Sequence, residues 1–144
     1  MKSAQTRSGL YDLNGRRTYD SQDVGEPALG TEMTDERAIE VAGLAIRSER
    51  TDDLAVVTVS GDLSLANADA LDQELRRLEA AGVAEIVLDL RKLDFIDSAG
   101  ARVLYFAYTR SRGSGDRLRM IRGPAPVQRV IGGLGLGNLL PFVD

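Results

Sequence analysis

Short apolar runs alternate with amphipathic segments over most of the chain, from about residue 43 onward. Ala55–Val59 is dense in β-branched residues and predicts a strand that ends at Gly61-Asp62. Glu85–Leu90 is a short apolar run between turn signals, which predicts a buried strand followed by a connecting loop over residues 91–96. Leu118–Ile121 predicts a further strand.

Apolar residues at steps of three and four predict three helices in the same region. The first covers about residues 66–80, with one face formed by Ala68, Leu71, Leu75 and Leu78. The second covers about residues 99–112, with a shared face formed by Val103, Phe106, Ala107 and Arg110. The third begins at Pro124, a residue that suits the start of a helix, and runs to about Ile131.

Residues 1–42 differ from the rest because they are rich in Gly, Ser, Thr, Asp and Arg and have no sustained apolar period. This composition predicts a flexible N-terminal extension before a folded domain over residues 43–144. Within it, Thr34-Asp35-Glu36 predicts the start of a short helix that runs through Val41 and ends at Gly43.

The predicted elements define an α/β fold. Leu44–Ile46 is the first predicted strand, and Leu139–Val143 is a short edge strand at the end of the chain. Strands that alternate with helices predict a mixed sheet of four to five strands with three to four helices packed on it. The length of 144 residues and an apolar fraction of 43% are enough for one domain with a core.

Composition excludes several classes of function. The chain has no cysteine and no histidine, which excludes disulfides, thiolate metal sites and a Ser-His-Asp nucleophile. We therefore expect neither a metal nor a cofactor, and no enzyme activity. The net charge of −4 predicts no general attraction for nucleic acid. No apolar run is long enough to span a membrane and no secretory signal is evident, so we expect a cytoplasmic protein.

The strongest candidate site is Asp97-Ser98-Ala99-Gly100, between the predicted loop and the second helix. A serine at the start of a helix has two physical uses. Its hydroxyl can cap the free backbone N–H groups of the first turn. Alternatively, those N–H groups and the positive end of the helix dipole can accommodate a phosphate on that oxygen.

Three other patterns have a functional and a plainer interpretation. Asp94 and Asp97 could form an acid/base pair or a magnesium site, but loop carboxylates are more often solvated or turn-forming. The glycines of residues 132–137 follow a helix rather than a strand, which favours turns over a phosphate loop. The arginines of residues 110–129 could contact an acidic partner, but a solvated surface is favoured.

Three stretches in this order resemble the STAS domain, and more narrowly the bacterial anti-sigma factor antagonists. They are Val59-Ser60-Gly61-Asp62-Leu63, residues 86–100 with Asp97-Ser98-Ala99-Gly100, and residues 127–136 with Leu134-Gly135-Leu136. The resemblance covers about residues 44–143. Each stretch is weak evidence by itself, and the three in order are strong evidence.

The resemblance implies a switch. In this family a partner phosphorylates the serine after the aspartate, which corresponds to Ser98. That partner is an anti-sigma factor and also a serine kinase with an ATPase-type fold. The unphosphorylated antagonist binds it and releases the sigma factor, and a serine phosphatase resets the cycle. The family implies no membrane partner. The implied partner-binding residues are Gly61, Asp62, Leu63, Ser64, Asp94, Asp97, Ala99, Gly100 and Arg102.

The chain departs from the common pattern at two of these positions. Ala99 stands where many members have a second serine, and Arg102 stands where an uncharged residue is usual. Arg102 lies four residues after Ser98, so both side chains fall on one helix face and the arginine could pair with a phosphate. The alternative function is a STAS module of a signalling scaffold or the cytoplasmic subunit of a lipid transport complex.

Overall fold

The computed structural model describes residues 34–143, which form a six-stranded sheet and three helices. In chain order the elements are β1 (Thr34–Val41), β2 (Leu44–Thr51), β3 (Leu54–Leu63), α1 (Ala68–Ala80), β4 (Glu85–Ile96), α2 (Ser98–Arg112), β5 (Leu118–Ile121), α3 (Ala125–Gly133) and β6 (Phe142–Val143). The predicted α/β class and the order of elements from residue 44 onward are confirmed.

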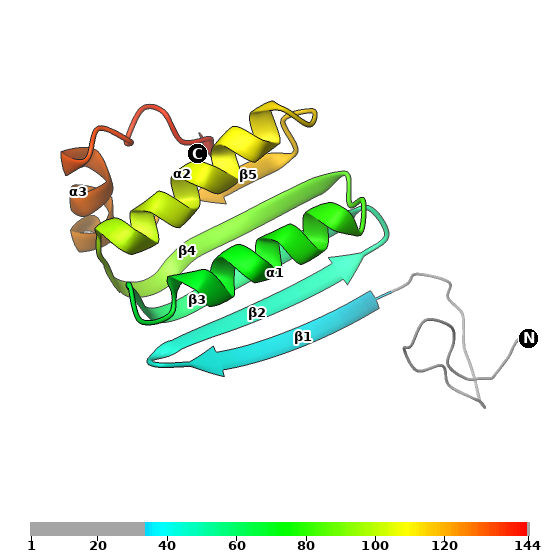
Figure 1. Ribbon diagram of the computed structural model, residues 1–144, viewed down its shortest axis with the longest axis horizontal. Helices are drawn as coiled ribbons and strands as arrows, with labels where there is room; N and C mark the ends of the chain where they lie inside the picture. Colours follow the sequence, from blue (N-terminus) through cyan, green and yellow to red (C-terminus); the bar gives the residue numbers. More distant parts are fainter. Residues whose placement is uncertain (1–33, 144) are drawn as a thin grey trace, which may run out of the picture. The chain divides into compact units, whose positions relative to one another are not determined.

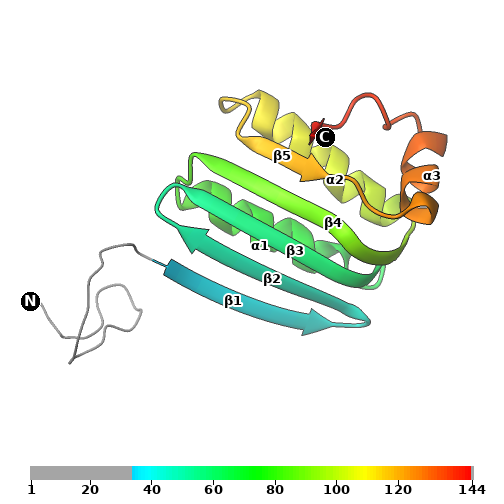
Figure 2. The ribbon, with the colours of Figure 1, turned by 180° about the vertical axis from the view of Figure 1, so that it is seen from behind.

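The strands lie in the order β1-β2-β3-β4-β5-β6, so neighbours in the sequence are also neighbours in the sheet. β2 and β3 are antiparallel, whereas β3, β4, β5 and β6 pair in parallel. α1 and α2 lie side by side across one face of the sheet, and α3 packs near the end of β4 (Figure 1). The opposite face carries no helix from the described residues (Figure 2). No helix in residues 34–143 is long and apolar enough to cross a membrane.

The core lies between the sheet and the two long helices. β3 alternates as a half-buried strand should, and Ala55, Val57 and Val59 are fully buried on the helix side. The apolar face predicted for α1 is confirmed, because Leu71, Leu75 and the other two residues of that face are buried. Burial of these faces against each other positions the loops at one end of the sheet.

The predicted helix before residue 43 is wrong, because Thr34–Val41 is a strand at the edge of the sheet. Ala42 and Gly43 join it to β2 with backbone φ angles of +46° and +85°. Two left-handed residues form the tight turn that suits the twist of a hairpin, and pairing with β2 outweighs the local capping signal. The sheet therefore has six strands rather than four to five. The flexible extension remains a prediction for residues 1–33, which lie outside the described part.

The predicted loop over residues 91–96 is also wrong, because β4 continues to Ile96. Its pairing with β3 shifts register twice, between Thr58 and Ser60 and again between Gly61 and Asp62. Such irregularities break the regular alternation of buried and exposed residues, which is the signal that predicts a strand. The predicted end of β3 at Gly61-Asp62 is also wrong, because β3 continues to Leu63, which pairs with Ile96.

The face predicted for α2 is partly right. Ala101, Leu104 and Ala107 are buried against the sheet and Val103 packs against the same core, so Ala107 and Val103 of the predicted face belong there. Phe106 is 46% exposed on the outer side of the helix. Small residues such as Ala101 and Ala107 face the sheet instead and allow the helix to lie close to it.

One buried carboxylate connects α1 to β1 and β2. Glu74 accepts hydrogen bonds from the Ser48 hydroxyl at 2.7 Å and from Arg37 Nε at 3.1 Å, as well as from Arg77 of its own helix. Burial raises the pKa of Glu74, but the hydrogen bonds from Arg77 and Ser48 outweigh it, so the pKa lies below its ordinary value. A charged Glu74 therefore attaches β1 to the core.

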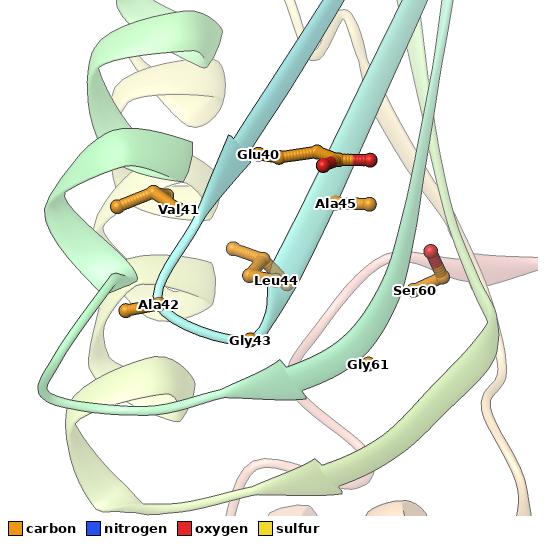
Figure 3. A pocket seen from close by; sticks show the side chains of 8 residues that line it. All are labelled: Glu40, Val41, Ala42, Gly43, Leu44, Ala45, Ser60 and Gly61. Atoms are coloured by element: carbon orange, nitrogen blue, oxygen red, sulfur yellow. The ribbon is translucent and has the colours of Figure 1, made fainter.

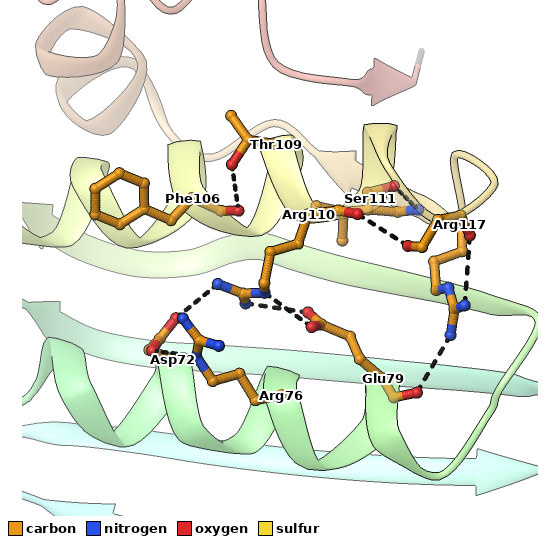
Figure 4. Close-up of polar contacts among 10 residues, drawn as sticks. Asp72, Arg76, Glu79, Phe106, Thr109, Arg110, Ser111 and Arg117 are labelled. Carbon is orange, nitrogen blue, oxygen red and sulfur yellow. Dashed lines mark hydrogen bonds and ion pairs between the residues drawn. The ribbon is translucent and has the colours of Figure 1, made fainter.

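A second ion-pair cluster joins the two long helices (Figure 4). Arg110 on α2 donates to both carboxylate oxygens of Glu79, at 2.8 Å and 3.0 Å, and to Asp72 at 3.2 Å. Arg76 donates to the other Asp72 oxygen at 2.9 Å. The Arg110 side chain is only 21% exposed, so these contacts are partly shielded from water.

We expect Arg110→Ala to lower the free energy of unfolding by about 1–3 kcal/mol, because it removes charge-assisted hydrogen bonds between helices. Arg112→Ala is the control, since that side chain is 65% exposed and its loss should cost less than about 0.5 kcal/mol. Urea unfolding of both variants measures the difference. Equal losses of unfolding free energy in the two variants would show that the ion-pair cluster does not stabilise the fold.

Candidate functional site

Ser98 is the first residue of α2 and is exposed. The residue before it, Asp97, has extended backbone angles and accepts a hydrogen bond from the Gly100 backbone N–H at 2.9 Å. Asp97 is therefore the N-cap of the helix, and the interpretation of Ser98 as its cap is wrong. The Ser98 hydroxyl is left exposed beside a capped helix end.

The same aspartate joins the helix to the loop between β3 and α1. Its second carboxylate oxygen accepts from the Leu65 backbone N–H at 3.1 Å, and its own N–H donates to the Leu63 carbonyl at 3.1 Å. Partial burial raises the pKa of Asp97, but hydrogen bonds from the backbone N–H groups of Gly100, Leu65 and Ala99 outweigh it. The pKa of Asp97 therefore lies below its ordinary value.

A buried asparagine holds that loop from its other side. Asn67 Oδ1 accepts from the Ser64 N–H at 2.9 Å, and Nδ2 donates to the carbonyls of Asp62 at 2.8 Å and Ala42 at 2.9 Å. The sequence reasoning missed Asn67. The available signal was an asparagine just before an apolar helical run, which predicts a helix cap, but this side chain caps nothing and supports two loops instead.

Gly61 lies where β3 passes the β1–β2 hairpin (Figure 3). Its φ is +94°, a conformation that residues with side chains rarely adopt, and a Cβ there would overlap the Gly43 carbonyl oxygen. The Gly43 carbonyl accepts from the Asp62 N–H at 3.0 Å. This part of β3 is thus packed onto the hairpin, so Gly61 has a structural reason for being glycine.

The structure separates the predicted partner-binding residues into two groups. Leu63 and Gly100 are buried, and a Cβ on Gly100 would lie 2.8 Å from both Cγ and the carbonyl oxygen of Leu63. These two residues pack β3 against α2, and neither is available to a partner. The exposed or partly exposed residues are Gly61, Asp62, Ser64, Asp94, Asp97, Ser98, Ala99 and Arg102.

A shallow groove borders Ser98 along α2. It is lined by Ser98, Ala101, Arg102, Tyr105, Leu134 and Leu136. Tyr105 and Leu134 are 36% and 47% exposed, and Leu65 on the other side of Asp97 is 81% exposed. The sequence reasoning missed these apolar surface residues, although Leu134 and Leu136 lie in one of the stretches on which the resemblance rests.

The magnesium interpretation of Asp94 and Asp97 gains no support. Both carboxylate oxygens of Asp97 accept backbone N–H groups, and Asp94 is exposed. Residues 34–143 contain no group of three or more acidic, cysteine or histidine side chains that could hold a metal ion.

A family model described as "Mlab, STAS domain" matches residues 46–141. The fold, the order of motifs and this match agree, and the chain belongs to the STAS domain family. This confirms the resemblance to the STAS domain.

Two of the following three similar proteins are named as anti-sigma factor antagonists. Osmosensory protein A of Mycobacterium tuberculosis is 28% identical over 66% of this chain, and the match spans only 60% of that relative. An anti-sigma F factor antagonist of Paenibacillus polymyxa is 26% identical over 70% of this chain and 87% of its own. A crystal structure of an anti-sigma factor antagonist from Mycobacterium paratuberculosis has a TM-score of 0.62 and 25% identity, over 70% of this chain and 86% of that one.

The low pKa of Asp97 predicts a pH dependence of stability. The ionised carboxylate stabilises the folded state above its ordinary pKa of 3.8, and this contribution is lost as the pH falls through the lower folded value. We therefore expect the difference in unfolding free energy between wild type and Asp97→Asn to shrink from neutral pH to below about pH 3.

Urea unfolding at a series of pH values measures this difference. Ser98→Ala is the control, because it removes no titrating group and its difference from wild type should not change with pH. A constant difference for Asp97→Asn would contradict the role given to its carboxylate.

Proposed function

We propose that the protein is an anti-sigma factor antagonist, a binding module without catalytic activity of its own. In its unphosphorylated form it binds an anti-sigma factor that is also a serine kinase, and this binding releases the sigma factor. Phosphorylation at Ser98 ends the binding, and a serine phosphatase restores it. The names of the Paenibacillus and Mycobacterium paratuberculosis relatives support the general role.

The observation that carries the proposal is the environment of Ser98. Its hydroxyl is exposed at the first residue of α2, and capping of that helix is already provided by Asp97. A kinase can reach the oxygen without breaking a structural hydrogen bond of the helix end. The positive end of the helix dipole beside it favours an added negative charge.

The chemical step is phosphoryl transfer from the partner's ATP. A bond forms between the Ser98 oxygen and the γ-phosphorus, and the bond from that phosphorus to the bridging oxygen breaks, which releases ADP. The hydroxyl proton passes to a base of the kinase. This chain supplies only the acceptor and its orientation.

Charge explains why the modification would end binding. The phosphate adds about −1.5 to −2 charge units to a surface that already carries Asp97. Asp62, also exposed, lies near the end of β3, just before the loop that Asn67 and Asp97 hold. A bound partner would have to remove water from the new charge, which is costly unless it supplies an opposite one.

We expect incubation with the partner kinase and ATP to place phosphate on Ser98 and on no residue of Ser98→Ala. Ser98→Asp should bind the anti-sigma factor kinase roughly 5- to 150-fold more weakly than unphosphorylated wild type, because the substitution places a charge in the interface. Mass spectrometry and a pull-down with the serine-kinase-type anti-sigma factors of the same genome measure both. Ser114→Asp is the matched control, an exposed serine at the far end of α2.

Arg102 gives a test that is specific to the phosphorylated form. It is exposed and lines the groove together with Ser98. Its charge is slightly unfavourable near the helix N-terminus but can pair with a phosphate one turn away. We expect Arg102→Ala to lower the melting temperature of the phosphorylated protein more than that of the unmodified protein. Equal shifts in the two forms would exclude the pairing.

A second candidate function rests on the description of the family model, which names Mlab. The chain would then be the cytoplasmic subunit of a lipid transport complex. Co-purification with membrane transport subunits, together with the absence of any kinase that modifies Ser98, would favour this function.

A further inference from the structure

Leu65 is the most exposed large apolar side chain in residues 34–143, with 81% of its surface open. It lies in the turn between β3 and α1, two residues before the buried Asn67. An isolated apolar side chain held out from a turn beside a partner surface is a suitable anchor for an apolar pocket. Its backbone N–H is held by a single acceptor, Asp97 Oδ2, at 3.1 Å.

Asp97 therefore has two tasks, one for each carboxylate oxygen. Oδ1 accepts from Gly100 at the helix end, and Oδ2 accepts from Leu65 in the turn. Ser98 is its immediate neighbour in the chain. The modified residue, Ser98, and the turn that carries Leu65 are thus connected through the Asp97 side chain.

A phosphate on Ser98 would disturb this arrangement for two reasons. It places a second negative charge next to the ionised Asp97, and the two like charges repel each other. It also brings strong acceptors to the N–H groups of the first turn of α2, including that of Gly100, which Asp97 now occupies. If the Asp97 side chain rotates away from these donors, the Leu65 N–H loses its hydrogen bond to Asp97 Oδ2, the only one that the structure shows for it.

We infer that Asp97 is a positioning residue that couples Ser98 phosphorylation to the turn at Leu65, so that Leu65 is held out for the partner only while Ser98 is unmodified. This deepens the proposed function and rests on it for the identity of the partner, an apolar pocket of the anti-sigma factor kinase. The switch then has a local conformational part in addition to the repulsion between phosphate and partner.

One substitution separates the two tasks of Asp97. Asparagine caps helices about as well as aspartate, but it has one acceptor oxygen instead of two. Asp97→Asn should therefore keep the bond to Gly100 and lose the bond to Leu65 without unfolding the helix end. In this variant the hydrogen bond to the Leu65 N–H is already absent, so phosphorylation of Ser98 should cause no further loss at Leu65.

The experiment uses the full chain with phosphoserine installed at position 98 during synthesis, so that it does not depend on finding the kinase. NMR measures the amide exchange of Leu65 in wild type and in Asp97→Asn, each with and without the phosphate. We expect exchange at Leu65 to rise at least about threefold on phosphorylation of wild type, and not to rise further in Asp97→Asn. The Leu118 amide, which donates to Ser111 Oγ at 3.0 Å far from the site, should not change.

An unchanged exchange rate of the Leu65 amide in phosphorylated wild type would overturn the inference, and so would an equal further rise in Asp97→Asn.

Binding to the kinase tests the role of the Leu65 side chain as an anchor. Leu65→Ala should weaken it roughly tenfold, whereas Leu54→Ala, 40% exposed at the opposite end of β3, should not. If no kinase binds or modifies the wild-type chain, the proposed function fails, and so does the role of Leu65 as an anchor for the kinase. The exchange measurement still decides whether Asp97 couples phosphorylation of Ser98 to the turn at Leu65.

Discussion

The site depends on one carboxylate that accepts backbone N–H groups from two separate segments. Asp97 caps α2 through Gly100 and holds the β3–α1 turn through Leu65. Without it, the backbone bond from the Asp97 N–H to the Leu63 carbonyl would remain, but the Leu65 N–H in the turn would lose its link to the helix end. Because the cap is supplied by the residue before it, Ser98 is available for chemistry without a structural duty. The position of one negative charge therefore sets both the accessibility of the hydroxyl and the shape of the surface around it.

Packing explains why this end of the sheet can hold a defined surface. Gly61 and Gly100 are places where backbone or neighbouring side chains approach too closely for a Cβ. Asn67 then satisfies carbonyl and N–H groups that would otherwise be left without partners in a partly buried loop. The fold contributes rigidity here, and the surface contributes exposed apolar groups such as Leu65 and Tyr105.

The sequence predicts the elements with regular spacing and fails where pairing with distant strands decides. The face of α1 follows from the spacing of Ala68, Leu71, Leu75 and Leu78, and β5 from the short alternating segment Leu118–Ile121. The strand at residues 34–41 carries a local helix signal, and only its pairing with β2 overrides it. Residues 91–96 lose their alternation at register shifts. Asp97 appears in the sequence only as a possible partner-binding or carboxylate-pair residue, and Asn67 carries no recognised signal, because the atoms that both side chains reach belong to loops that meet only in three dimensions.

The position of β1 has a consequence for work with fragments of the protein. A fragment cut at Leu44, where the family resemblance begins, would lack the outermost strand and would leave the hydrogen-bonding edge of β2 open to other chains. It would also remove Arg37 and leave the buried Glu74 with fewer donors. Aggregation of such a fragment would then reflect a missing strand rather than an unstable domain.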